Sequence, residues 1–136
     1  MSSPKLDRSA DRHHHEHGSA TVELIILLPA LFAVMFLGMQ AALFHHARAV
    51  AIAAAQEGAH AAAAETGREA DGIAAATAFI ADAGGRDVLT TSHASSTRSS
   101  TTVTVTVRGR SLSVIPGWSP AVVQSASLPV ERLTAP

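Results

Sequence analysis

The longest apolar stretch of this chain lies near its N-terminus. Leu24–Phe44 contains no charged residue, Gln40 is its one polar side chain, and Pro29 and Gly38 interrupt it. Crossing the hydrocarbon core of a bilayer takes about 20 mostly apolar residues. We therefore predict one transmembrane helix over about Thr21–Phe44. A buried helix of a soluble protein is disfavoured, because the rest of the chain is too small to cover a helix that is apolar on all sides.

A cleaved secretory signal is the rival interpretation of this stretch. The apolar part of such a signal has only about 7–15 residues, and a cleavage site of small residues follows it. Here the stretch is longer, and the residues at its end are Phe44-His45-His46. The alanine-rich sequence further on still offers small residues for cleavage. We favour the membrane anchor and keep the signal as the alternative.

Basic residues predict the orientation of the span. Lys5, Arg8 and Arg12 precede it, whereas Arg48 alone lies close after it. The positive-inside rule then places the N-terminus in the cytoplasm and the rest of the chain outside it.

The sequence beyond the span first favours helix. Arg48–Glu65 is rich in alanine, the best helix former, so we expect the transmembrane helix to continue to about Thr66. Its small side chains allow other helices to approach closely. Gly67 is a natural helix C-cap. A second helix is expected over Arg68–Ala83, with Gly84-Gly85 ending it.

The last third of the chain has a strand pattern. Thr102–Val107 alternates threonine and valine, which predicts a strand with valines on one face. Flanking strands are expected at about Val88–Ser95 and Ser125–Arg132. The connections would be Ser95–Ser100 and Pro116–Pro120. The simplest arrangement is a three-stranded antiparallel meander packed on the second helix.

These elements predict an α+β, pilin-like fold in three parts. They are a cytoplasmic leader over 1–18, a transmembrane and extended helix over 19–66, and a small extracytoplasmic domain over 67–136. Pro129 should place the last strand at an edge or a bulge. For Trp118 we favour a place in the small core over a partner site.

Composition refines this prediction. The 136 residues include no cysteine, and the chain is 47% hydrophobic but only 4% aromatic. Disulfides are therefore excluded, and alanine buries little area at about 25 cal/mol per Å². We expect a thin core that gains stability from partners. The net charge of −1 gives no sign of nucleic-acid binding.

The most informative motif stands where the polar leader meets the apolar stretch. Gly18 ends the polar part, Ser19 follows it, Glu23 comes five residues after Gly18, and Pro29 six residues later. Cleavage after Gly18 would make Ser19 the new N-terminus and Glu23 the fifth residue. This pattern resembles a type IV prepilin signal, and in detail the TadE-like family, the minor pseudopilins of tight-adherence (Tad) pili.

The resemblance continues through the alanine-rich stretch to about residue 66. Where the family often has Gly-Ala-Arg, this chain has Gly58-Ala59-His60. The resemblance implies cleavage by prepilin peptidase, retention in the membrane, and assembly with other pilins, pseudopilins and the pilus assembly platform. The alternative function is an envelope interaction protein that is anchored by its signal, never processed, and without a pilus role.

Glu23 and Pro29 each have two readings. A carboxylate in a membrane helix costs about 2.5–3.5 kcal/mol at the centre and less near an end, so a partner favours its retention. The resemblance implies that this partner is the new α-amino group. Alternatively, Glu23 complements the helix dipole near an N-cap at Ser19 or Thr21. Pro29 should kink the helix, with or without a role.

Other candidate chemistry is weak. His13-His14-His15-Glu16-His17 offers metal-binding side chains, but the sequence supplies no second shell around them. Serine, histidine and aspartate occur without a nucleophile elbow, and no phosphate-binding loop is present. We therefore expect no enzyme activity, no cofactor and no metal. The sequence does not distinguish among adhesion, secretion and DNA uptake.

Overall fold

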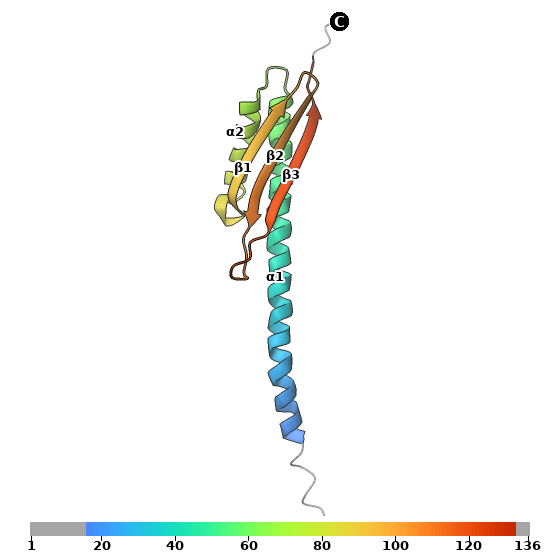
Figure 1. Cartoon of the computed structure of the whole chain (residues 1–136), viewed down its shortest axis with the longest axis vertical. Coiled ribbons are helices and arrows are strands. Elements are labelled where there is room, and N and C mark those ends of the chain that lie inside the picture. Colours follow the sequence, from blue (N-terminus) through green and yellow to red (C-terminus); the bar gives the residue numbers. More distant parts are fainter. Residues whose placement is uncertain (1–15, 133–136) are drawn as a thin grey trace, which may run out of the picture. The chain divides into compact units, whose positions relative to one another are not determined.

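The computed structural model describes residues 16–132, and the side chains from residue 21 onward. It confirms the α+β prediction of a long helix, a short helix and a small antiparallel sheet (Figure 1). In chain order the elements are α1 (Glu16–Ala63), α2 (Glu69–Asp82), the 3-10 turn η1 (Gly85–Asp87), β1 (Leu89–Arg98), β2 (Thr102–Ser111) and β3 (Ala121–Pro129).

The chain forms two compact units, one ending at Leu37 and the other beginning at Gly38. α1 contributes to both, because its residues run without interruption from Glu16 to Ala63 and include Pro29. The first unit, as far as its side chains are described, is helix alone. The second unit contains the rest of α1, together with α2 and the sheet.

The sheet of the second unit is an antiparallel meander in the order β1-β2-β3. Val103, Val105 and Val107 are fully buried, as their alternation predicted. They pack in one cluster with Leu89, Val122, Ile80 and the buried alanines of α1 and α2. The two helices therefore cover the valine face of the sheet.

Glycines bring α1 and α2 into close contact. A Cβ atom on Gly58 would lie 2.6 Å from the carbonyl oxygen of Gly72, and one on Gly72 would lie 2.8 Å from the Cβ of Ala62. Real Cβ atoms do not approach so closely, so a side chain at either position would push the helices apart. The space between the helices is filled by backbone and by alanine methyl groups.

The opposite face of the sheet carries hydroxyl groups. Thr104 Oγ1 lies 2.8 Å from Ser127 Oγ, and Thr106 Oγ1 lies 2.8 Å from Ser125 Oγ. These cross-strand pairs join β2 to β3. The alternation in β2 thus separates a buried valine face from a polar face.

Two predicted connections end at different residues. The first turn was expected at Ser95–Ser100, but β1 continues to Arg98, because residues up to Arg98 pair with β2. Ser99 makes the turn: its N–H donates to Thr102 O at 2.9 Å, and its Oγ accepts from the N–H of Thr102 at 3.0 Å. β3 begins at Ala121, earlier than expected, and Pro129 ends it on the edge strand, as predicted.

The prediction that Trp118 fills the core is wrong. Its side chain is 51% exposed. Leu89 and the valines already fill the space over the sheet, since they are fully or almost fully buried. Trp118 lies in the loop between β2 and β3, outside that cluster.

Candidate membrane and assembly interface

The first unit presents a helix whose large apolar side chains are exposed. Between residues 22 and 37 these side chains are Val22, Leu24, Ile25, Ile26, Leu27, Leu28, Leu31, Phe32, Val34, Met35, Phe36 and Leu37. In the part of the chain that the structure describes, α1 is the one helix long and apolar enough to cross a membrane. Such a helix fits a single-pass membrane anchor.

The motif residues all lie on this helix. Glu23 is exposed and stands among exposed apolar neighbours, and Pro29 is an exposed residue inside the helix. Gly18 and Ser19 belong to the first turns of α1, and their surroundings lie outside the described side chains. The predicted N-cap at Ser19 or Thr21 is wrong for the uncleaved chain, because α1 already begins at Glu16.

The motif segment also matches a known family. The family model described as TadE-like protein matches residues 18–60, so the match begins at Gly18 and includes Glu23 and Pro29. Residues 18–60 are a TadE-like segment. The predicted resemblance is confirmed there, and it suggests a protein associated with Tad pili. Comparison with curated proteins and with solved structures finds no match to the chain.

The second half of the TadE-like segment is used inside the chain. Ala47, Ala51, Ala54, Ala55 and Ala59 are fully buried, and they belong to the cluster that contains the sheet valines. Their small size predicted close contacts with other helices. In the structure they pack within the chain, against α2 and the sheet.

Gln40 has a role that sequence reasoning missed. Its side chain is only 3% exposed. Its Nε2 donates to Leu112 O at 3.3 Å, and its Oε1 accepts from Ser113 Oγ at 2.9 Å and from the N–H of Val114 at 3.0 Å. The available signal was its position as the lone polar residue of a long apolar stretch, which implies a partner.

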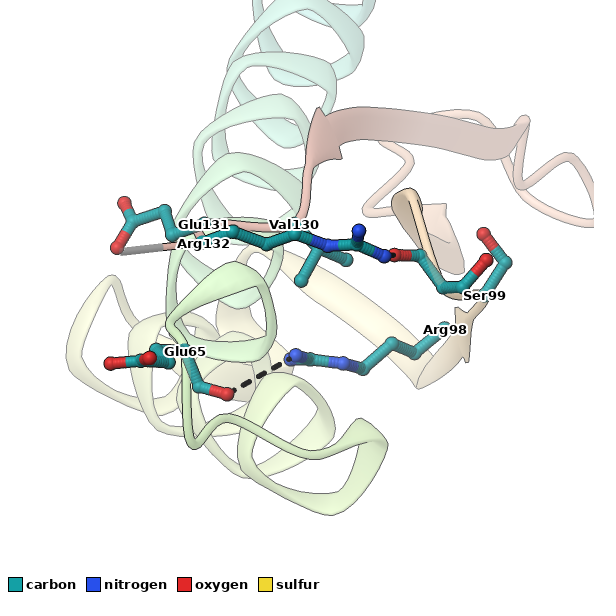
Figure 2. Close-up of a pocket in the computed structure, with 7 residues that line it drawn as sticks. Glu65, Arg98, Ser99, Val130, Glu131 and Arg132 are labelled. Carbon is teal, nitrogen blue, oxygen red and sulfur yellow. Dashed lines mark hydrogen bonds between the residues drawn. The ribbon is translucent and has the colours of Figure 1, made fainter. Parts of the chain in front are cut away.

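The C-terminal end of α1 is held by Arg98. The guanidinium donates to the carbonyl oxygens of Ala62 and Ala64 and reaches Glu65 O at 3.5 Å (Figure 2). Carbonyls at a helix end lack partners within the helix, and a cation also complements the dipole there. The N–H of Glu131 donates to Ala63 O at 2.9 Å from the other side.

A pocket of about 450 Å³ opens beside this helix end. Its lining includes Arg98, Glu131 and Arg132 (Figure 2). The guanidinium of Arg98 already donates to carbonyl oxygens at the end of α1, and Arg132 donates to Ser100 O at 2.6 Å. Arg98 therefore joins the end of β1 to α1, and Arg132 joins the segment after β3 to the first turn of the sheet, so both arginines of this pocket are used within the fold.

The histidine-rich leader lies outside the described side chains. Among the side chains that are described, no group of three histidine, aspartate or glutamate residues lies together as a metal ligand set would.

Proposed function

We propose that this chain is a minor pseudopilin of a Tad/Flp-type pilus or a related secretion machine. It is a non-enzymatic component that prepilin peptidase cleaves after Gly18. The observation that carries the proposal is the TadE-like segment itself: it begins at Gly18 and continues into a helix that exposes apolar side chains, with Glu23 as the one acid between residues 18 and 56. The cleaved protein stays in the bacterial cell membrane with its C-terminal unit outside the cytoplasm.

Glu23 gives the proposal its assembly mechanism. The carboxylate is exposed on a helix of apolar side chains, where solvation by lipid is unfavourable. Cleavage after Gly18 creates an ammonium group on Ser19. That group, on the same or a neighbouring subunit, neutralises Glu23 as helices pack. Deleting one partner of a buried ion pair costs roughly 3–5 kcal/mol, and water near the headgroups reduces this value.

The exposed apolar side chains of α1 supply the contact area. In lipid, helices associate through van der Waals packing rather than through the hydrophobic effect. Leu24, Leu27 and Leu31 lie on one side of the helix because they are spaced at three and four residues, and all three are exposed. Neighbouring pilin-like helices would pack on surfaces of this kind.

Processing is tested by the N-terminus of the mature protein. Mass spectrometry of the protein from pilus-forming cells should find Ser19 first, and Gly18→Leu should leave the full-length precursor in the membrane. An intact N-terminus in the wild type would favour the unprocessed signal-anchored protein. A reporter fused after Pro136 should be active outside the cytoplasm if the orientation is correct.

Assembly is tested by Glu23→Ala, with Glu57→Ala as the matched control. Glu57 is an exposed acid on the same helix, in its second half. Glu23→Ala should still be cleaved and remain in the membrane, since losing an ionisable group favours insertion. It should crosslink less to neighbouring pilin-like subunits and reduce piliation, whereas Glu57→Ala should not. Equal crosslinking and piliation in wild type and Glu23→Ala would contradict the mechanism.

A further inference from the structure

The loop between β2 and β3, residues 112–120, is an ordered structure with internal hydrogen bonds. Ser113 Oγ accepts from the N–H of Ile115 and donates to Ile115 O, each at 3.0 Å. The N–H of Trp118 donates to Ile115 O at 3.2 Å, and the base of the loop closes through Ser111 N–H to Pro120 O at 3.0 Å. Trp118 is thus held on a defined scaffold.

Gln40 fixes this loop at a particular level of α1. Its amide donates one hydrogen bond to Leu112 and accepts one each from Ser113 and Val114, and all three lie within the second unit. Gln40 stands four residues before Phe44, where the apolar stretch ends. One helical turn is about 5.4 Å, so the loop contacts α1 about one turn inside the apolar boundary.

The loop carries apolar side chains at that level and no charge. Trp118 is 51% exposed, and Leu112, Val114 and Ile115 are half-buried. Tryptophan concentrates at membrane–water boundaries, where its ring sits among the headgroups. An exposed tryptophan held at the edge of an apolar helix has the chemistry of a membrane-interface contact.

Basic residues flank the same end of the unit. Arg48 follows Phe44 by about one turn, and Arg108 and Arg110 are the last outward-facing residues of β2 before the loop; all three are exposed. The acidic residues of this end, Asp82 and Asp87, lie around the start of β1. Arginines just outside the apolar boundary favour anionic lipid headgroups.

We propose that the β2–β3 loop is a second membrane contact, which seats Trp118 in the interfacial layer of the bilayer that α1 spans. This inference rests on α1 being a membrane anchor and is independent of cleavage at Gly18 and of pilus assembly. The partner is the lipid surface. The loop replaces water around Gln40 and brings its own apolar side chains to the headgroup region.

Trp118 itself reports on the proposal, because it is the single tryptophan of the chain. The full chain is reconstituted into vesicles of phosphatidylethanolamine and phosphatidylglycerol, and tryptophan emission is recorded with lipids brominated near the headgroup end or near the tail end of the acyl chain. Emission should be blue-shifted, and it should lose more intensity with the shallow bromines than with the deep ones. Acrylamide in the water should quench it weakly.

The matched control moves the tryptophan to the far end of the sheet. Thr102 is exposed at the start of β2, next to the turn opposite the loop. In the double variant Trp118→Phe, Thr102→Trp, emission should be that of a water-exposed indole and should not respond to brominated lipid. Equal lipid quenching in the control would overturn the proposal, because it would show that the quenching is not specific to the loop.

Three further outcomes also overturn the inference, each in a recognisable way. If brominated lipid does not quench Trp118 and the chain still resists carbonate extraction, the membrane anchor is supported and the loop contact is contradicted. If carbonate extracts the chain from the vesicles, both the membrane anchor and the loop contact are contradicted. In the third outcome, brominated lipid does not quench Trp118, but added pilin-like subunits protect it from acrylamide. Trp118 would then contact a protein partner instead of lipid.

Discussion

The two halves of α1 differ in the size and the exposure of their side chains. Up to Leu37 the helix exposes large side chains such as Leu27 and Phe36, whereas from Gly38 onward it buries small ones such as Ala51 and Ala54. Both halves belong to one continuous helix. The difference therefore lies in what surrounds each half, and not in the backbone conformation.

Size explains which residues each half uses. Alanine and glycine let the sheet and α2 come close to the second half of α1, where contact of backbone with backbone leaves no room for larger groups. Leucine, isoleucine and phenylalanine in the first half would be unfavourable in water at such exposure. Lipid removes that cost, since the hydrocarbon core solvates apolar side chains. Hence the exposed large residues fit a single-pass membrane anchor.

A charge placed in each half should separate these environments most strongly. Val34→Lys puts an ammonium near the middle of the apolar stretch, and insertion should lose about 3 kcal/mol on the scale derived from translocon experiments. Ile52→Lys adds the same charge to a partly exposed position of the second half and should leave insertion unchanged. The inserted fraction of each variant is measured by glycosylation mapping. Equal loss in both variants would mean that the first half is not special.

The next largest effect is expected at the end of the second half. Arg98→Met removes the cation from the carbonyls of Ala62 and Ala64, and hydrogen bonds to charged groups contribute about 1.5–3 kcal/mol. The free energy of unfolding in detergent, from urea titration, should fall by about that amount. Arg86→Met, at an exposed position of η1, is the control and should change it by less than about 0.5 kcal/mol. Unchanged stability in Arg98→Met would show that water replaces the guanidinium.

Periodicity and composition predicted most of this fold. The uncharged stretch at Leu24–Phe44 predicted the exposed apolar helix, the alternation at Thr102–Val107 predicted the buried valines, and Gly84-Gly85 marked the end of α2. The spacing of Gly18, Glu23 and Pro29 predicted the TadE-like segment. These signals are local, so a single sequence contains them.

Long-range contacts could not be predicted in the same way. The bonds of Gln40 reach residues more than 70 positions away, and those of Arg98 reach back to α1. The sequence around Gln40 and Arg98 contains no signal that identifies their hydrogen-bond partners. Trp118 was misplaced for a related reason: hydrophobicity alone does not say whether a large side chain meets a core that valines have already filled.

The boundary between the two halves is tested by Gln40→Leu. The substitution leaves the N–H of Val114 without its acceptor, while the hydroxyl of Ser113 keeps Ile115 O as an acceptor, and an unsatisfied buried group costs about 1–3 kcal/mol. Because Ser113 and Val114 are only half-buried, the loss should lie at the lower end of that range. Hydrogen exchange at the Val114 N–H should accelerate, while Gln56→Leu, at an exposed position, should leave it unchanged. Slow exchange in Gln40→Leu would mean that the hydrogen bonds within the loop keep it in place without Gln40.

The smallest predicted effect is the most discriminating, because it differs in sign between two glycines of α1. Gly58→Ala places a methyl group 2.6 Å from Gly72 O and 3.0 Å from Val105 Cγ1. Overpacking of this kind costs about 1–3 kcal/mol, and the higher helix propensity of alanine returns about 1 kcal/mol. We expect a net loss of about 1 kcal/mol in the free energy of unfolding. Gly38→Ala meets nothing within 4 Å, so it should be neutral or slightly stabilising. If urea titration in detergent gives both variants the same sign, then α1 and α2 can separate without loss, and close backbone packing is not what requires small residues in the second half of the helix.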